Sequence, residues 1–169
     1  MADNKMRDVR LDKVVINIGT GNDEAKQANA KRLLELITGR KPVDERSKRR
    51  IPAFKISPGT KIGAYVTVRR GTEQLAKRLL DAVDNRVKQG SISNNTASFG
   101  IREYIDISGV KYDPKIGMLG MNVNLSFKRP GTRVSIRKIK PGRVAKSQAV
   151  VAPAEIEEYL KGVLKAEVA

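Results

Sequence analysis

The stretch Met121–Arg129, MNVNLSFKR, alternates apolar and polar residues more regularly than any other part of the chain. Successive side chains of a β-strand point to opposite faces, so this pattern predicts a strand that buries only one side. The buried side would carry Met121, Val123, Leu125 and Phe127. A sheet built from such strands has one covered face and one exposed face.

The residues that follow predict a turn and a partner strand. Pro130 and Gly131 suit the two central positions of a type II turn, because the second position requires a positive φ. The stretch RVSIRKI, residues 133–139, then returns as the second strand of a hairpin. This hairpin would project Lys128, Arg133 and Arg137 from a scaffold whose other side joins the core.

Two earlier stretches alternate in the same way and predict strands. They are DKVVINIG, residues 12–19, and GAYVTVRR, residues 63–70. FGIREYIDI, residues 99–107, predicts a further strand. Cations and hydrogen-bonding groups suit phosphates, ribose hydroxyls and base edges. On the free face of the sheet we expect such groups at Lys13, Asn17, Tyr65, Thr67 and Arg69.

Three amphipathic stretches predict helices. The first begins at Asn22 or Asp23 and stops at Gly39, the second runs from Thr72 to Gly90, and the third covers residues 153–167. Residues 91–98 and 111–120 are rich in turn-forming residues and predict loops. The order β, α, β, α, β, β, β, α predicts a single two-layer α+β domain over residues 1–169. Its sheet would be mostly antiparallel, with helices packed on one face and the other face free.

The charge of the chain indicates a polyanionic partner. Its 34 Lys and Arg residues against 18 Asp and Glu residues give a net charge of +16 at pH 7. The segments 46–61 and 128–146 together hold fourteen cations and no acidic residue. Like charges repel one another, whereas phosphates neutralise them and release counterions. We therefore expect the free face and these two basic segments to bind RNA.

The composition excludes most catalytic chemistry. The chain has no cysteine and no histidine, so it cannot use thiolate nucleophiles, Cys/His metal sites or imidazole acid–base catalysis. The carboxylate pairs fall at helix starts, in loops or on helix surfaces, where the helix dipole and solubility explain them. The sequence shows neither a membrane-spanning run nor the apolar core of a signal peptide. We expect a cytoplasmic, non-enzymatic protein without cofactor, metal or membrane partner.

Several features leave alternatives open. GTGNDEAK, residues 19–26, suits either a nucleotide-binding loop or a tight strand-to-helix turn, although acids stand where a nucleotide fingerprint needs glycine. Phe54 suits either base stacking or a place in the core. Asn17 and Thr67 suit either RNA contact or ordinary exposed strand positions. The charge alone also suits a protein that binds any nucleic acid or an anionic membrane.

Several motifs, in matching order and spacing, resemble the large-subunit ribosomal protein family numbered five in the universal scheme, which binds 5S ribosomal RNA. They lie between about Arg10 and Arg143 and comprise VVINIGTG, LLELITGRKPV, RSKRRIPAFKI, GAYVTVRRG, FGIREYIDI, KYDPKIGMLGMNV and KRPG. KYDPKIG and KRPG resemble the archaeal and eukaryotic branch, and the lack of a long extension resembles its archaeal members.

The resemblance implies an α+β fold whose sheet holds 5S RNA and docks it in the central protuberance of the large subunit. Contact residues of the family fall on Asn17 and Thr67, and Arg40 stands where the family usually has glutamine. The basic loop 46–61 would approach transfer RNA in the peptidyl site or large-subunit RNA, and 128–146 would anchor neighbouring large-subunit RNA. The segment 111–120 would take part in a bridge to a small-subunit head protein.

These considerations give three groups of candidate residues. The RNA-binding candidates are Lys13, Asn17, Arg40, Thr67, Arg69, Arg70, Lys128, Arg129, Arg133, Arg137 and Lys138. The candidates on the loop that faces transfer RNA or ribosomal RNA are Arg46, Lys48, Arg49, Arg50, Lys55 and Lys61. The candidates for the intersubunit bridge are Lys111, Tyr112, Asp113 and Lys115.

Overall fold

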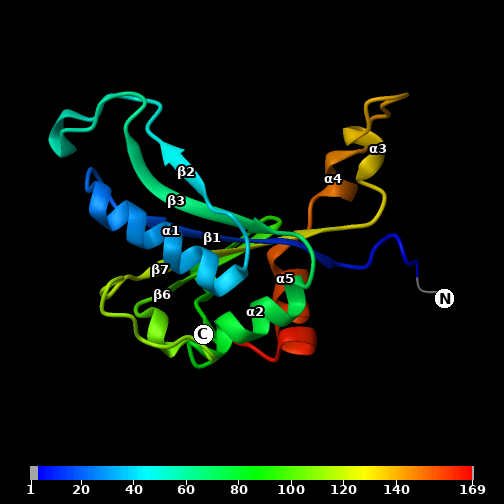
Figure 1. Ribbon diagram of the computed structural model, residues 1–169. Coiled ribbons are helices and arrows are strands. Elements are labelled where there is room, and N and C mark those ends of the chain that lie inside the picture. Colours follow the sequence, from blue (N-terminus) through cyan, green and yellow to red (C-terminus); the bar gives the residue numbers. More distant parts are fainter. Residues whose placement is uncertain (1–3, 169) are drawn as a thin grey trace.

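A six-stranded antiparallel sheet forms the centre of the protein (Figure 1). The computed structural model describes residues 4–168. The strands follow the order β2-β3-β1-β7-β6-β5 across the sheet, so β1 and β7 lie at its middle. Their bounds are β1 (Arg10–Gly19), β2 (Val43–Arg46), β3 (Lys61–Val68), β5 (Ile92–Ser93), β6 (Thr96–Ile101) and β7 (Met121–Lys128). A separate parallel pair is formed by β4 (Arg86–Val87) and β8 (Glu167–Val168).

The main helices lie on one face of this sheet. α1 (Glu24–Thr38) packs against β3, and α2 (Thr72–Asp81) packs against β1. α5 (Pro153–Tyr159) continues into a π-helical turn, η4 (Leu160–Leu164), which contacts α2. The short elements are η1 (Pro52–Phe54), η2 (Gln89–Ser91), η3 (Tyr104–Asp106), α3 (Arg133–Ile136) and α4 (Lys146–Ala149). The predicted α+β class with a mostly antiparallel sheet is confirmed.

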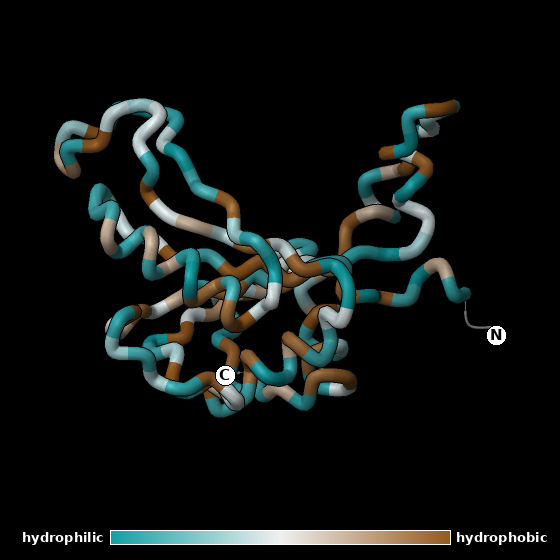
Figure 2. Tube along the Cα trace, in the orientation of Figure 1, coloured by the Kyte–Doolittle hydropathy of each residue, from teal (hydrophilic) through white to brown (hydrophobic). Residues whose placement is uncertain are grey.

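The core lies between the sheet and these helices. Figure 2 shows hydrophobic residues gathered along the central strands and the helices that cover them. Burying one aliphatic side chain contributes about 1.5–3 kcal/mol, and a register shift of one residue would expose a whole strand side. The alternating positions of the central strands therefore fix the register. Their buried residues are Val14, Ile16, Ile18, Ala64, Val66, Val68, Met121, Val123, Leu125 and Phe127.

Helix α1 has the predicted ends. Asp23 is its N-cap, because its carboxylate accepts hydrogen bonds from the backbone N–H groups of Ala25 at 3.0 Å and Lys26 at 3.2 Å. Gly39 ends the helix with a φ of 62°, and its N–H donates to the carbonyl of Glu35 at 2.7 Å. A left-handed residue after the last turn is the usual stop signal of an α-helix.

The second predicted helix, Thr72 to Gly90, is too long. α2 ends at Asp81, and Asp84 and Asn85 have φ values of 52° and 55°, which an α-helix cannot include. The residues after this turn form β4 and η2. The helix does begin at Thr72, as predicted, and Gly71 is its N-cap.

The strands at one end of the sheet differ from the prediction. Residues 91–98 were expected to be a loop, but they contain β5 and the start of β6, joined by a turn in which Asn95 has a φ of 63°. The strand expected at residues 99–107 ends at Ile101, and a 3-10 turn follows at Tyr104–Asp106. The sequence also did not predict β2, which is a four-residue edge strand without alternation.

The hairpin expected after Met121–Arg129 is wrong. Residues 133–139 do not return along β7, because β1 and β6 already occupy both of its edges. Gly131 does take a positive φ of 85°, but the chain then forms the helical turn α3 and leaves the sheet. Residues 129–150 build an arm that projects from the body, and this segment is called the basic arm below (Figure 1).

The third predicted helix, residues 153–167, is divided. Its α-helical part ends at Tyr159, the π-helical turn ends at Leu164, and Lys165 takes a φ of 57° before β8. Tyr159 packs edge-on against Phe127 with a centroid distance of 5.4 Å, which joins α5 to the sheet. Among residues 4–168, no helix is both long and apolar enough to cross a membrane.

Candidate nucleic-acid interface

Polar side chains line the sheet face that the helices leave open, in rows that cross the strands. In the first row, Asn17 of β1 pairs with Tyr65 of β3 on one side and with Asn122 of β7 on the other. Gly100 of β6 follows Asn122 in the same row. The strand neighbours of Asn17, Ile16 and Ile18, are buried under the helices, so Asn17 points to the open face.

The second row places Thr67 on the same face. Thr67 of β3 pairs with Val15 of β1, and Val15 pairs with Asn124 of β7, which pairs with Ser98 of β6. All four of these residues are half-buried. The predicted placement of Asn17 and Thr67 on one open face is therefore confirmed by the strand register.

The side-chain amide of Asn17 has an oxygen atom without a hydrogen-bond partner among residues 4–168. Its Oδ1 atom is buried and accepts no hydrogen bond from any residue in the described part of the chain. A buried polar atom without a partner costs about 1–3 kcal/mol. Rotation of the amide toward a donor on a bound molecule would remove this cost.

Two further candidates extend the open face. Lys13 pairs with Ser126 across β1 and β7, which places it one row beyond Val15. Arg69 follows β3 two residues after Thr67 and is exposed. Both side chains add positive charge beside uncharged hydrogen-bonding groups, the combination that RNA backbones and base edges require.

Arg40 and Arg70 lie together, but at the end of the helix layer rather than among the polar rows. With Arg78 they line a hollow of about 400 Å³ between the end of α1 and the start of α2. Arg78 donates from Nε to the carbonyl of Ser108 at 2.6 Å. No described acidic residue lines this hollow, so its charge suits a phosphate group.

The basic loop 46–61 is an ordered extension between β2 and β3. Its base is closed by Ser47, whose N–H donates to the carbonyl of Thr60 at 2.8 Å and whose carbonyl accepts from Gly59 at 2.8 Å. Its tip is closed by Ile51 and Ile56, which form an isolated antiparallel bridge. The exposed candidate side chains on this extension are Arg46, Lys48, Arg49, Arg50, Lys55 and Lys61.

Phe54 lies at the tip of this loop and is 71% exposed. A place in the core, one of the two interpretations of the sequence, is therefore wrong. An exposed aromatic ring among cations has both a stacking surface for a base and nearby charge for a phosphate.

Asp44 joins the basic loop to the body. Its carboxylate forms an ion pair with Lys31 of α1, lies 3.7 Å from Nζ of Lys61 and accepts a hydrogen bond from Nε2 of Gln27 at 3.1 Å. The hydrogen bond from Lys31 is the main reason that the pKa of Asp44 lies below its ordinary value of 3.8. This pairing ties β2 to α1 and uses part of the charge of Lys61.

Two candidates at the base of the basic arm, Arg129 and the last residue of β7, Lys128, form contacts within the chain. Arg129 donates from one terminal nitrogen to both carboxylate oxygens of Glu155, each at 2.6 Å, and its side chain is 15% exposed. Lys128 forms an ion pair with Asp12, although half of its side chain remains exposed. Arg129 therefore holds the arm to α5 rather than presenting charge to a partner.

The other cations of the arm point to solvent. Arg133, Arg137 and Lys138 are exposed, and Arg137 donates from Nε to the carbonyl of Lys140 at 2.7 Å, which closes the tip of the arm. Ile136 and Ile139 beside them are also exposed, and Figure 2 shows hydrophobic and hydrophilic residues interspersed along the arm. The arm is therefore basic, as predicted, but it is not a β-hairpin.

The bridge candidates lie on a loop without a helix or strand, as predicted. Asp113 shapes this loop, because its Oδ1 accepts from the N–H of Lys115 at 2.9 Å and its own N–H donates to the hydroxyl of Tyr104 at 3.0 Å. Lys111, Tyr112 and Lys115 are exposed around it. The loop thus presents an aromatic ring and two cations on an ordered turn.

The turn at residues 19–26 does not resemble a phosphate site. The N–H groups of Thr20 and Gly21 both donate to the carbonyl of Ile62. The carboxylate of Asp23 occupies the start of α1, and the hydrogen bond from the N–H of Lys26 is the main cause that lowers its pKa. The backbone donors that a nucleotide would need are therefore already used, which favours the tight strand-to-helix turn.

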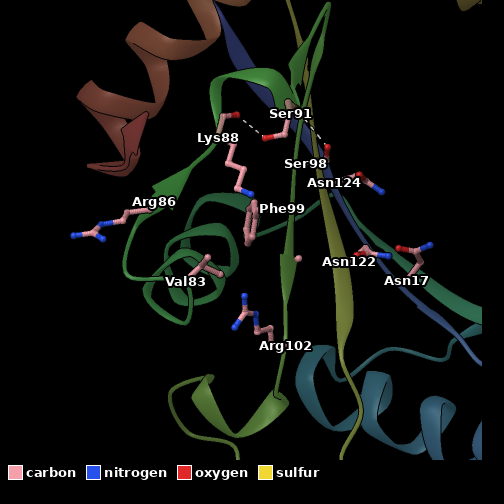
Figure 3. Close-up of a pocket in the computed structure, with 11 residues that line it drawn as sticks. Asn17, Val83, Arg86, Lys88, Ser91, Ser98, Phe99, Arg102, Asn122 and Asn124 are labelled. Carbon is pink, nitrogen blue, oxygen red and sulfur yellow. Dashed lines mark hydrogen bonds between the residues drawn. The ribbon is translucent and has the colours of Figure 1, made fainter. Parts of the chain in front are cut away.

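One polar hollow at the edge of the sheet was not predicted from the sequence. It has a volume of about 640 Å³ and is lined by Asn17 and Asn122 together with the cations Arg86, Lys88 and Arg102 (Figure 3). Arg86 and Lys88 fell within the helix expected to reach Gly90, so their place beside β6 was not visible in the sequence. The one sequence signal was that Arg86 and Lys88 directly follow Asp84 and Asn85, two residue types that often end helices in turns.

Comparison with known proteins gives a consistent result. Residues 4–56 match the family model described as ribosomal protein L5, and residues 61–156 match the model that describes the C-terminus of the same ribosomal family. The chain is similar to archaeal proteins named large ribosomal subunit protein uL5. It is 40% identical to that of Sulfurisphaera tokodaii over 94% of this chain and 90% of the relative. It is 42% identical to that of Nanoarchaeum equitans over 82% and 83%, and 45% identical to that of Aeropyrum pernix over 79% and 70%. The chain belongs to the ribosomal protein L5 family.

Proposed function

We propose that the open face of the sheet binds 5S ribosomal RNA and helps to dock it in the central protuberance of the large ribosomal subunit. The observation that carries this proposal is the shared open face of Asn17 and Thr67, which are flanked by exposed cations. Uncharged amides and hydroxyls form hydrogen bonds with base edges and 2′-hydroxyls, and these contacts differ from one RNA to another. Cations alone would bind the phosphates of any RNA.

Family membership supports the broader setting. Members of this family are structural, non-enzymatic components of the ribosome, and the relatives compared above are named as proteins of the large subunit. The chain is accordingly a structural constituent of the large ribosomal subunit and not an enzyme. Ribosomal RNA and neighbouring ribosomal proteins are the partners that follow from this membership.

We further propose that the basic loop 46–61 approaches transfer RNA in the peptidyl site. The loop is ordered at its base by Ser47, carries Phe54 at its tip and projects well beyond the body of the protein (Figure 1). An ordered extension with an exposed ring and several cations can contact transfer RNA while the sheet remains bound to 5S ribosomal RNA. The exposed cations of the basic arm would contact large-subunit RNA in the same way.

The loop around Asp113 supports a contact with a protein of the small-subunit head. Its exposed Tyr112 and its lysines lie on a turn fixed by Tyr104 and belong to neither basic segment. Tyrosine is enriched where protein surfaces meet, since its ring is apolar and its hydroxyl polar. This loop is the part of the chain that we propose for the intersubunit bridge.

A charge-only binder is the second candidate function, because fourteen cations lie in two segments without acids. Competition between 5S ribosomal RNA and an unrelated RNA duplex of equal length, at about 0.2 M salt, separates the two candidates. A structural 5S site predicts that the duplex displaces little 5S RNA. Equal displacement by both RNAs would support the charge-only binder.

A further inference from the structure

The polar hollow lies where the open face of the sheet meets the outer edge of β6 (Figure 3). β5 pairs with β6 only at Thr96 and Ala97. From Ser98 to Ile101, therefore, no strand in the described part of the chain lies beside this edge. Gly100 has no side chain, so the row through Asn17 and Asn122 stays open toward the edge.

One side of the hollow offers amide groups. Asn17, Asn122 and Asn124 line it, and none of their side chains forms a hydrogen bond with another residue in 4–168. Each amide provides two donors and an acceptor, a set that matches the hydrogen-bonding edge of a nucleobase. A ligand with a hydrogen-bond donor would also satisfy the buried Oδ1 of Asn17, which would favour binding on this side.

The other side of the hollow offers positive charge and an aromatic ring. Arg86, Lys88 and Arg102 are exposed, and none of them forms an ion pair with a described carboxylate. Phe99 is half-buried, and Figure 3 shows its ring next to the side chain of Lys88. No described acidic residue lines the hollow. Phe99 pairs with the buried Val123, so its ring lies on the helix side of β6, and this side of the hollow suits a phosphate group.

We propose that this hollow takes up one unpaired nucleotide of the RNA that lies on the sheet. Its base would contact the asparagines on the open face, and its backbone would pass round the strand edge at Gly100, so that its phosphates face the three cations. The volume of about 640 Å³ lies within the roughly 300–1,000 Å³ of pockets that hold small molecules. This inference rests on the proposed binding of RNA to the sheet and adds the place where a single nucleotide is recognised.

A peptide strand paired with the edge of β6 is the competing occupant. Such a strand would use main-chain hydrogen bonds along the edge and would not need three cations around one point. Arg86, Lys88 and Arg102 line the hollow, whereas the nearby acids Asp84 and Asp106 line only the adjoining one, and this excess of positive charge favours the nucleotide.

The variant Gly100→Val tests the inference without removing a charge. The backbone of Gly100 is not left-handed, so valine fits a strand here, and a Cβ would lie 3.4 Å from Oδ1 of Asn122 at the floor of the hollow. Gly162→Val is the matched control, because a Cβ there meets nothing within 4 Å and the position lies on η4.

The probes are 5S ribosomal RNA transcripts in which one unpaired nucleotide at a time is replaced by an abasic ribose. For the wild type and the control, one abasic position is expected to weaken binding about tenfold, since hydrogen bonds between amide side chains and one base edge have about this effect or more. Gly100→Val is expected to bind the intact transcript about tenfold more weakly than the wild type does. Its affinity should not fall further when the transcript carries the abasic ribose at that position.

Equal binding of every transcript by Gly100→Val and the control would overturn the inference, and would leave a peptide strand as the occupant of the β6 edge. If Gly100→Val does not fold, the pair Lys88→Gln and Arg102→Gln replaces it, with Lys77→Gln and Lys161→Gln on the helix layer as control. A wild type that does not prefer 5S RNA to the duplex refutes the proposed function instead, which keeps the two failures distinct.

Discussion

Arg129 and Glu155 join the end of β7 to the start of α5 through two hydrogen bonds of 2.6 Å. The pair links the sheet to the C-terminal helix across the base of the basic arm, where Arg129 also donates to the carbonyl of Gln148 at 3.4 Å. The direction of the arm therefore depends on a contact between residues that are 26 positions apart in the sequence.

We expect Arg129→Ala and Glu155→Gln each to lower the free energy of unfolding by about 1–2 kcal/mol, because each leaves a partly buried charged group without its partner. Urea unfolding of both single variants and of the double variant measures the coupling. A coupling energy near zero in this cycle would show that the pair does not hold the arm.

Asp44 gives a pH-dependent contribution to stability. Its pKa is lower in the folded protein than its ordinary value of 3.8, so its ionised form favours folding. The contribution is complete above that value and is lost as the pH falls through the lower folded pKa. We expect Asp44→Asn to reduce stability at pH 7, with a difference from the wild type that shrinks at acidic pH.

Denaturant unfolding at a series of pH values measures this difference. Glu45→Gln is the control, since Glu45 is exposed and forms no ion pair within residues 4–168. A difference between wild type and Asp44→Asn that stayed constant down to pH 2 would contradict the role of the Lys31 contact.

The basic loop is expected to contribute charge rather than sequence preference. Replacing Arg49 and Arg50 by alanine should reduce the slope of log affinity against log salt by roughly 0.7–0.9 for each phosphate that the loop then leaves unneutralised. Filter binding of an unrelated RNA duplex over a salt series measures the slope. The control Lys77→Ala with Lys161→Ala removes the same charge from the helix layer and should leave the slope nearly unchanged.

Phe54 is expected to lie close to transfer RNA in the assembled ribosome. A photoreactive phenylalanine at this exposed tip position should crosslink to transfer RNA bound in the peptidyl site. The same group at Val163 on η4, which is 38% exposed, serves as the control. Crosslinks from position 54 to ribosomal RNA alone would contradict the contact with transfer RNA.

The central strands could be predicted from the sequence because their alternation is local. β1, β3 and β7 each carry their own pattern, and burial of Ile16, Val66 and Val123 determines the face of the residues between them. This pattern alone predicted that Asn17 and Thr67 lie on the open face of the sheet. The short strands β2 and β5 have no such pattern, and only pairing with longer neighbours forms them.

Other features depended on contacts that the sequence does not display. The stretch after Pro130 has strand-like residues, but the occupied edges of β7 leave it no partner. The stripe of α2 continues to Val83 and Val87, yet left-handed Asp84 and Asn85 end the helix and bring Lys88 to the edge of β6. The pairing of Arg129 with Glu155 also becomes visible only once α5 lies beside the sheet.

The most direct measurement of the central claim is the affinity of Asn17→Ala and Thr67→Ala for 5S ribosomal RNA at about 0.2 M salt, with the unrelated duplex as reference. Each replacement removes an uncharged hydrogen-bonding group from the open face, so each should weaken 5S binding by on the order of 1 kcal/mol and leave duplex binding nearly unchanged. Equal losses for both RNAs, or no loss for either, would contradict recognition of RNA by this face.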